Sequence, residues 1–382
     1  MERRKFLKIA GTSSIILAAG GVTFVSTRVP KNALKPWQEA GSLYADPMRR
    51  ALSYAILAPN PHNRQPWIVR FISETEILLK CDLDRLLPVT DPFSRQIVIG
   101  LGCFLELFSL AASEQGYMAN IEYFPQGEVD DALDGRPIAK LTLIKQDGLM
   151  PDPLFAQVLK RRTNRNPYDT TRLIADDVLM GIKSAASKTV YVGVTNEDKP
   201  LQDLRQVTRD AMMVEFTTPE VHRESVELMR IGRSEIEANP DGISLGGAFL
   251  EALSLVGLLT RESLADPTSQ PFQAGIDMFK QAAMTSMGFV WINTESNDRR
   301  AQVEAGRAYM RVALAATAEG LSIQPMSQAL QEYATMAPHY KIIHQMLTNH
   351  TTARVQMLAR LGYCEDINPA PRWPLATRIE QA

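Results

Sequence analysis

Two long stretches of the chain repeat apolar residues at the spacing of an α-helix. Residues 94–117 (SRQIVIGLGCFLELFSLAASEQGY) and 298–321 (DRRAQVEAGRAYMRVALAATAEGL) each end near a glycine suited to a helix C-cap. At a constant offset of 204 positions, six residues of the first stretch recur in the second: Arg95, Gly102, Leu110, Ala111, Ala112 and Gly116 match Arg299, Gly306, Leu314, Ala315, Ala316 and Gly320. The pattern predicts two long helices that are copies of each other.

Shorter elements repeat in the same order along the chain. The helix before Ala58 and the strand 68–71 have counterparts in the helix before Ala186 and the strand 190–194, and the strand 139–144 has one in 355–361. Because several elements recur together, the chain is predicted to contain two copies of one α+β unit. We place the first half at residues 46–150 and the second at residues 151–382.

The second half is longer than the first. From Val178 to Gly306 there are 128 positions, whereas the matching span from Ala51 to Gly102 has 51, so the second half carries about 77 extra residues. We place this insertion at about residues 206–281. It has amphipathic segments of its own and a hinge-like stretch, NPDGISLGG, so we interpret it as a lid. We interpret the methionines of residues 278–287 as packing residues of this lid rather than as a cofactor site.

The N-terminus has the pattern of an export signal. Arg3 and Arg4 precede Phe-Leu-Lys and an uncharged stretch, residues 9–25, which resembles a bacterial twin-arginine signal. Residues 1–26 are therefore predicted to be a signal or a retained membrane anchor, and residues 27–45 a linker. The prediction implies use of the export machinery and a periplasmic location. The alternative is a basic start on an ordinary buried helix.

Composition and charge exclude several classes of protein. The chain has 382 residues, of which 45% are hydrophobic, so it can bury a large core and is not predicted to be disordered. Its 41 basic and 43 acidic residues leave no basic excess for a nucleic-acid backbone. Neither the cysteines nor the histidines have metal-ligand spacing, so no metal site is expected; these residues are Cys81, Cys103, Cys364, His339, His344 and His350.

The two halves differ in two motifs that carry candidate chemistry. Only the first half has the polar loop APNPHNRQPW, residues 58–67, and only the second has the arginine-rich motif RRTNR, residues 161–165. A loop rich in amides and imidazole between prolines is typical of a binding edge. The alternative is a polar loop that satisfies its own backbone.

Four segments resemble motifs of nitroreductase-like flavoproteins, in the order found in that family. VLKRRTNRNPYD is similar to their Arg-x-Ser/Thr-x-Arg/Lys motif, and the loop 58–67 is similar to their Ala-Pro-Ser-x-x-Asn-x-Gln-Pro-Trp loop. GLSIQPMSQ, residues 320–328, and LGYCEDINPAPRWPL, residues 361–375, resemble a later turn and a C-terminal tail. With two fused halves, the chain resembles the Acg family of FMN-binding oxidoreductases. The resemblance implies a nitroreductase-like α+β fold, folded as a pseudo-dimer in one chain around a single FMN.

The resemblance also implies cofactor-binding residues from both halves. Arg161, with Arg162 and Thr163 in the same motif, corresponds to the residues at the FMN phosphate, and Arg165 to the residue near flavin N1 and O2. The first half would contribute Pro59, Asn60 and Asn63, although Asn60 stands where the family commonly has serine. Residues of the later turn and tail complete the set: Pro325, Met326, Ser327 and Arg372. No catalytic residue is predicted.

The implied function is flavin-dependent electron transfer. FMN would take reducing equivalents from a donor and pass them to a small acceptor, such as a nitroaromatic or quinone-like compound. A periplasmic location would offer little NAD(P)H, so the donor stays open. The alternative is a protein that binds or sequesters FMN beneath its lid without turnover. The fused halves predict a monomer.

Overall fold

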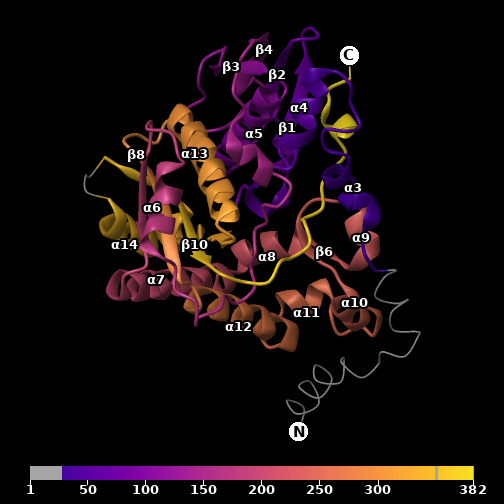
Figure 1. The fold of residues 1–382 in the computed structure, drawn as a ribbon. Helices are drawn as coiled ribbons and strands as arrows, with labels where there is room; N and C mark the ends of the chain where they lie inside the picture. Colours follow the sequence, from indigo (N-terminus) through magenta and orange to yellow (C-terminus); the bar gives the residue numbers. More distant parts are fainter. Residues whose placement is uncertain (1–27, 349–351, 382) are drawn as a thin grey trace.

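The computed structural model describes residues 28–348 and 352–381, which form two similar α+β halves and an insertion (Figure 1). The first half has helices α3 (Lys31–Glu39), α4 (Pro47–Ala55) and α5 (Arg95–Glu114), and strands β1 (Trp67–Phe71), β2 (Glu76–Cys81), β3 (Tyr117–Tyr123) and β4 (Ala139–Lys145). The short 3₁₀ turns η1 (Pro61–Asn63) and η2 (Leu83–Arg85) lie between them, and η3 (Pro153–Gln157) follows β4. The predicted signal, residues 1–26, lies outside the described residues.

The second half repeats this arrangement. It has helices α6 (Asp176–Ser184), α13 (Arg299–Ala318) and α14 (Ala337–Leu347), and strands β5 (Tyr191–Thr195), β8 (Gly288–Thr294), β9 (Ser322–Pro325) and β10 (Arg354–Gly362). Its 3₁₀ turns are η4 (Gln328–Leu330), η5 (Ala334–Met336) and η6 (Leu375–Arg378). The strand orders β1-β2-β4-β3 and β5-β8-β10-β9 are equivalent, and each sheet is antiparallel. The predicted α+β fold with two fused halves is confirmed.

The two long repeated helices form the centre of the molecule, between the two sheets (Figure 1). Residues of α5 and α13 share one hydrophobic core with both sheets. Helix α5 is long and apolar enough to cross a membrane, but 83% of its apolar window is buried in this core. Arg95, at the start of α5, donates to Leu330 O at 2.6 Å and Gln356 O at 2.8 Å, whereas Arg299 of α13 donates to Phe93 O at 2.8 Å. Each half therefore anchors the first turn of its long helix in the other half.

The insertion separates two strands that are otherwise neighbours in the sheet. Strands β1 and β2 are joined by four residues, but residues 196–287 lie between their counterparts β5 and β8. The insertion contains α7 (Asp198–Thr217), α8 (Pro219–Glu227), α9 (Gly232–Ala238), α10 (Ala248–Leu255), α11 (Arg261–Ala265), α12 (Gln270–Met284), β6 (Met229–Ile231) and β7 (Ile243–Leu245). The predicted boundaries of 206 and 281 were therefore too narrow, because α7 begins directly after β5.

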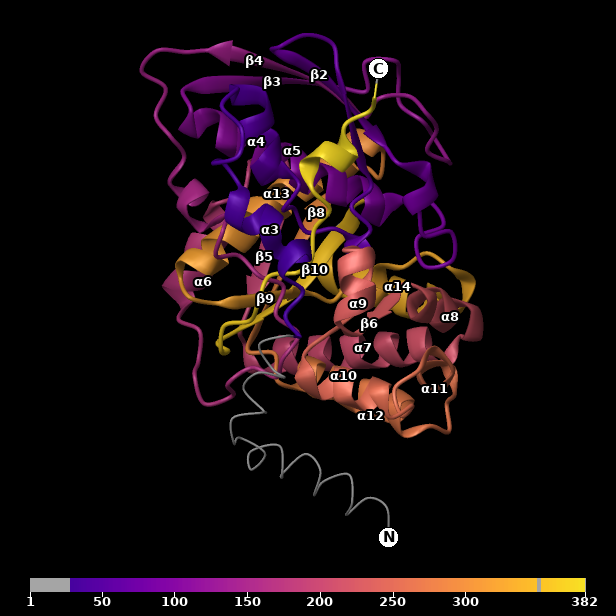
Figure 2. The same cartoon turned by 90° about the vertical axis from the view of Figure 1, so that its right-hand side faces the viewer.

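The predicted linker is partly wrong, because residues 31–39 form helix α3. Ala33, Leu34 and Trp37 are buried at helical spacing, and Trp37 Nε1 donates to Ala370 O at 2.8 Å. Apolar residues at this spacing give the segment a face that packs on the fold. The C-terminal tail beyond β10 returns to the first half, where Glu380 N donates to Val69 O at 2.8 Å (Figure 2).

Candidate functional site

The arginine motif lies beside the turn that follows β9. Thr163 forms an isolated parallel bridge with Ile323, and Asn164 N donates to Ile323 O at 3.1 Å. The turn at Pro325, Met326 and Ser327 begins two residues later, with Met326 N donating to Leu358 O at 2.8 Å. The structure thus brings together two of the four motifs that the sequence singled out.

Arg161 is a buried cation that pairs with no carboxylate among residues 28–348 and 352–381. Arg161 is 3% exposed, and among the described residues its guanidinium makes only a weak hydrogen bond of 3.4 Å to Thr163 Oγ1. No salt bridge involves Arg161 among the described residues. Burial lowers its pKa to about 10, an effect that nearby Tyr309 opposes. An arginine is costly to bury without a partner anion, so this environment fits a bound anionic group.

Arg165, the last residue of the motif, is exposed to solvent. Even so, burial by surrounding protein is the main cause that lowers its pKa. Its guanidinium makes no hydrogen bond or ion pair within residues 28–348 and 352–381. Arg165 is therefore a second cation that can meet a ligand.

Two groups that were not predicted complete this site. The hydroxyl of Tyr309, on α13, is buried without a hydrogen-bond partner, and its pKa is raised by burial, with Arg161 and Arg165 nearby. His62, in the loop of the first half, has a buried Nδ1 without a partner. Its pKa is lowered to about 4, first by burial and then by Arg165 and Arg64. The sequence offered only the position of His62 within the loop, and nothing in the helix pattern singled out Tyr309.

The loop of the first half has an unusual backbone next to these cations. His62, Asn63 and Gln65 all have positive φ angles, of 46°, 51° and 52°, which are uncommon for residues other than glycine. The loop lies on α5 at Gly100, where a Cβ would come within 3.0 Å of Asn60 Cβ. Backbone of this kind costs free energy and is held by its surroundings. The position of His62 beside Arg165 is therefore set by the rest of the loop.

The amide side chains of the loop are occupied by protein contacts. Asn60 Oδ1 accepts from Gln65 N at 2.7 Å, and its Nδ2 donates to Ala58 O at 3.1 Å. Asn63 Nδ2 donates to Pro371 O at 3.1 Å, and its Oδ1 accepts from Arg372 at 2.6 Å. The alternative of a polar loop that satisfies its own backbone thus accounts for Asn60, while Asn63 joins the loop to the C-terminal tail. Pro59 is half-buried at the start of this loop.

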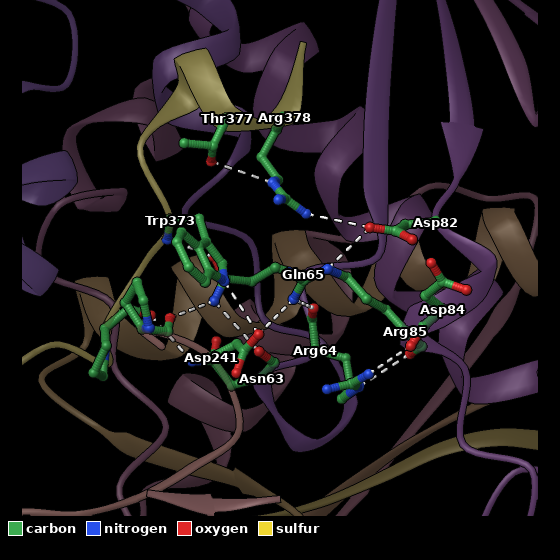
Figure 3. Close-up of polar contacts among 12 residues, drawn as sticks. Asn63, Arg64, Gln65, Asp82, Asp84, Arg85, Asp241, Trp373, Thr377 and Arg378 are labelled. Atoms are coloured by element: carbon green, nitrogen blue, oxygen red, sulfur yellow. Dashed lines mark hydrogen bonds and ion pairs between the residues drawn. The ribbon is translucent and has the colours of Figure 1, made fainter. Parts of the chain in front are cut away.

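Gln65 connects the loop to both the insertion and the tail. This fully buried side chain donates to Pro240 O at 2.7 Å and accepts from Trp373 N at 2.9 Å (Figure 3). Beside it, Asp241 of the insertion accepts from Arg85 at 2.6 Å and from Trp373 Nε1 at 3.1 Å. The hinge-like stretch NPDGISLGG is thereby held against the loop.

Arg372 and Arg162 have local partners. All five N–H donors of the fully buried Arg372 are used, by Asn63 and by the carbonyls listed here in chain order: Ile56, Leu57, Ala58 and Pro371. Three of these carbonyls, those of Ile56, Leu57 and Ala58, directly follow Ala55, the last residue of α4. Arg162 donates to Leu159 O and to Ile367 O, and its guanidinium lies over the Trp37 ring at 4.8 Å. In this structure both arginines hold the chain together, and their contact with phosphate stays a prediction.

Paired charges occupy the position that the offset of 204 residues relates to Cys103, a thiol near Arg161. At the offset of 204, Cys103 of α5 corresponds to Arg307 of α13, whose Nε contacts Glu106 at 2.8 Å. Arg311 contacts the other oxygen of Glu106 at 2.9 Å and donates to Ala185 O, at the end of α6, at 2.7 Å. Glu106 is 4% exposed. The cations here are neutralised internally, in contrast to Arg161 and Arg165.

Sequence comparisons agree with the resemblance in the motifs. No protein-family model matches the chain. A protein of Mycobacterium tuberculosis named putative NAD(P)H nitroreductase is 26% identical over 355 residues, covering 88% of this chain and 92% of the relative. A second from that organism, named putative NAD(P)H nitroreductase acg, is 26% identical over 339 residues, covering 86% of this chain and 94% of the relative.

Solved structures give a more distant likeness. The FMN-dependent nitroreductase NfnB of Mycobacterium smegmatis, in complex with NADPH, is 14% identical with a TM-score of 0.36, covering 60% of this chain and 98% of that one. NfnB from Sphigopyxis sp. strain HMH is 14% identical with a TM-score of 0.38, covering 60% and 99%. By sequence, this chain is similar over most of its length to two proteins that carry the name putative NAD(P)H nitroreductase.

Proposed function

We propose that this chain is an FMN-dependent oxidoreductase of the nitroreductase type, with one cofactor site at the boundary between its halves. The observation that carries the proposal is Arg161, a buried guanidinium close to the hydroxyl of Tyr309. In the part of the chain that the structure describes, Arg161 has no carboxylate partner and this hydroxyl has no hydrogen-bond partner. A phosphate monoester supplies the charge and the acceptor oxygens that these donors lack. The names of the sequence relatives support the same type of reaction.

Each residue has a role that follows from its chemistry. Arg161 and Thr163 would bind the phosphate, and Arg165 would face the flavin ring, where a cation stabilises negative charge. His62 is held neutral by its low pKa, so it adds no further positive charge and can exchange a hydrogen bond through Nδ1. Bound FMN would supply the electron transfer itself. The backbone of residues 325–327 would form the wall beside the ring.

The occupied second site supports one cofactor for each chain. Because Arg307 and Arg311 are paired with Glu106, that position offers no free cation for a second phosphate. One chain would then be functionally complete, in keeping with a monomer. Nitroaromatic or quinone-like acceptors remain the proposed substrates. Export by the twin-arginine route to the periplasm is likewise proposed from Arg3 and Arg4, and it leaves the electron donor open.

The test is cofactor content and affinity. Heat-released ligand from the purified chain should be FMN at about one per chain, and a ratio of two would contradict the single site. Arg161→Gln should weaken FMN binding about tenfold to a hundredfold, because a hydrogen bond to a charged group contributes roughly 1.5–3 kcal/mol. Arg172→Gln is the matched control, since this exposed arginine of the same segment stacks on Tyr363.

The alternative, a protein that sequesters FMN, is distinguished by turnover. The oxidoreductase should show bleaching of bound flavin by NADPH or a chemical reductant, followed by reoxidation when a nitroaromatic or quinone is added without oxygen. Flavin that is reduced but is not reoxidised by any acceptor would favour sequestration beneath the insertion.

A further inference from the structure

Helix α10 is apolar on its outer face as well as on its inner face. The run AFLEALSLVGLLT, residues 248–260, contains one charged residue, Glu251. The outer face of α10 and the turn that follows it carry exposed hydrophobic side chains, namely Phe249 (43% exposed) and Leu255 (68%) of the helix and Val256 (69%) and Leu258 (56%) just after it. A helix that is apolar all round is normally buried, and contiguous exposed apolar side chains mark interaction surfaces. We call these four residues the α10 face.

The inner side of α10 shows that its orientation is fixed. Leu250 and Leu253 pack against a small core that includes Ile231 and Leu259. Glu251 also points inward: it accepts from Arg28 at 2.8 Å and from Arg233 N at 3.0 Å. The helix therefore cannot rotate to bury its outer face without losing this core and the ion pair between Glu251 and Arg28.

The contact between Glu251 and Arg28 joins the α10 face to the N-terminal apolar stretch. Residues 9–25 are uncharged, and only three positions separate Val25 from Arg28. Three residues span at most about 10 Å of extended chain. Because Arg28 contacts α10, a bilayer that holds residues 9–25 would also lie beside the α10 face.

We propose that the α10 face docks on a lipid bilayer next to the N-terminal apolar stretch. A bilayer covers both apolar surfaces at once, whereas a helix formed by residues 9–25 that packed on α10 would leave its own outer side in water. A second copy of the chain is less suited, since stable interfaces take about 20–30 residues from each partner and the run containing this face is shorter. Figure 2 shows α10 and α12 at the edge of the molecule remote from strands β2, β3 and β4, so docking there leaves the central site free.

The proposal is tested with an environment-sensitive NBD label on the full-length chain. In a Cys364→Ser background the remaining Cys81 and Cys103 are buried, and burial raises both thiol pKa values to about 12, so neither should react. The label is placed at Leu255→Cys, with Val256→Cys as a second position. The control is Met150→Cys, at an 83% exposed apolar residue in another part of the fold.

On phosphatidylcholine vesicles, labels at 255 and 256 should shift to shorter emission wavelengths and lose most of their emission to doxyl-labelled lipid. The label at 150 should do neither. Labels at 255 and 256 that stay water-exposed on vesicles would overturn the proposal. Labels that are already shielded from water without lipid, and that doxyl-labelled lipid does not quench, would also overturn it. If that shielding falls when the protein is diluted, a second copy of the chain covers the α10 face. If it does not fall, residues 9–25 cover it.

Discussion

Gly102 of α5 and Gly306 of α13 lie against each other where the two central helices cross. A Cβ on Gly102 would clash with the backbone carbonyl of Val303, and a Cβ on Gly306 would clash with that of Ile99. The two clashes are equivalent at the offset of 204 residues, so the crossing point is the pseudo-twofold centre of the chain. The halves can approach this closely because neither residue has a side chain.

Gly102→Ala should therefore destabilise the fold. Overpacking of a tight core costs about 1–3 kcal/mol, and the atoms in the way here belong to the backbone, so we expect the upper end of that range. Urea unfolding would measure the loss. Gly181→Ala is the control: this helical glycine of α6 has nothing within 4 Å of the added Cβ, so alanine should be neutral or stabilise by about 0.5–1 kcal/mol. Equal effects of the two substitutions would contradict the close crossing.

The second prediction concerns the contact between the two halves at the candidate site. The positive charge of Arg165 helps burial to lower the pKa of His62. Arg165→Gln should therefore raise this pKa above about 4. NMR titration of the five histidines in the cofactor-free protein would measure it, with His62→Asn used to assign the signal. Asparagine suits this position because it tolerates positive φ angles. Arg172→Gln should leave the signal in place, and an unchanged pKa in Arg165→Gln would show that the two motifs do not face each other.

Much of this fold could be predicted from the sequence because its information is local and repeated. The spacing of apolar residues in 94–117 and 298–321 gave both central helices, and their constant offset gave the pairing of the halves. The separation of the polar loop and the arginine motif onto different halves predicted one shared site. The low pKa of His62 beside Arg165 agrees with that arrangement.

The rest depends on contacts between distant residues. Nothing in the local pattern shows that Arg372 would use its donors on the three carbonyls that follow α4, 314 to 316 positions away. The partners of Gln65 in the insertion and in the tail are equally remote in sequence. Polar residues of the loop could therefore be recognised as important, but their division between ligand contacts and structural contacts could not be predicted.

The third prediction separates these two roles for Asn63. Asn63→Ala removes an acceptor from buried Arg372 and a donor from Pro371 O, so it should destabilise the fold by about 1–3 kcal/mol. Urea unfolding of the cofactor-free protein would measure this. Asn120→Ala, on the exposed side of β3, should change stability by less than about 0.5 kcal/mol. Weaker FMN binding in Asn63→Ala without any loss of stability would instead indicate a direct contact with the flavin.

The last prediction concerns Glu215, near the end of α7 in the insertion. Its Oε2 accepts from Gln331 Nε2 at 2.9 Å, close to the turn that follows β9, and no cation pairs with it among the described residues. Burial is the main cause that raises its pKa from 4.5 to about 7; the hydrogen bonds from Gln331 and Gln328 oppose this, and Glu224 adds to it. The insertion thus contacts Gln331 through a carboxyl group that is protonated, and therefore neutral, below about pH 7.

The sign of the pH effect follows from proton binding. Between pH 4.5 and 7 the folded chain holds a proton on Glu215 that the unfolded chain has released, so the stability due to this group falls as pH rises and levels off above pH 7. Glu215→Gln replaces the carboxyl group with a neutral amide of similar shape that does not titrate. This variant should therefore lack the fall in stability with rising pH that Glu215 causes. Asp91, whose pKa burial raises to about 6, titrates in the same range in both proteins, so the difference between them isolates Glu215.

The measurement is the free energy of unfolding in urea from pH 4.5 to 8. The free energy of unfolding of Glu215→Gln is subtracted from that of the parent at each pH. This difference should fall as pH rises to about 7 and be constant above it. Glu227→Gln, at an exposed glutamate that ends α8, should give a difference without this fall. A flat difference for Glu215→Gln would mean that its carboxyl group is hydrated in the folded chain. The contact between α7 and Gln331 would then not depend on a proton.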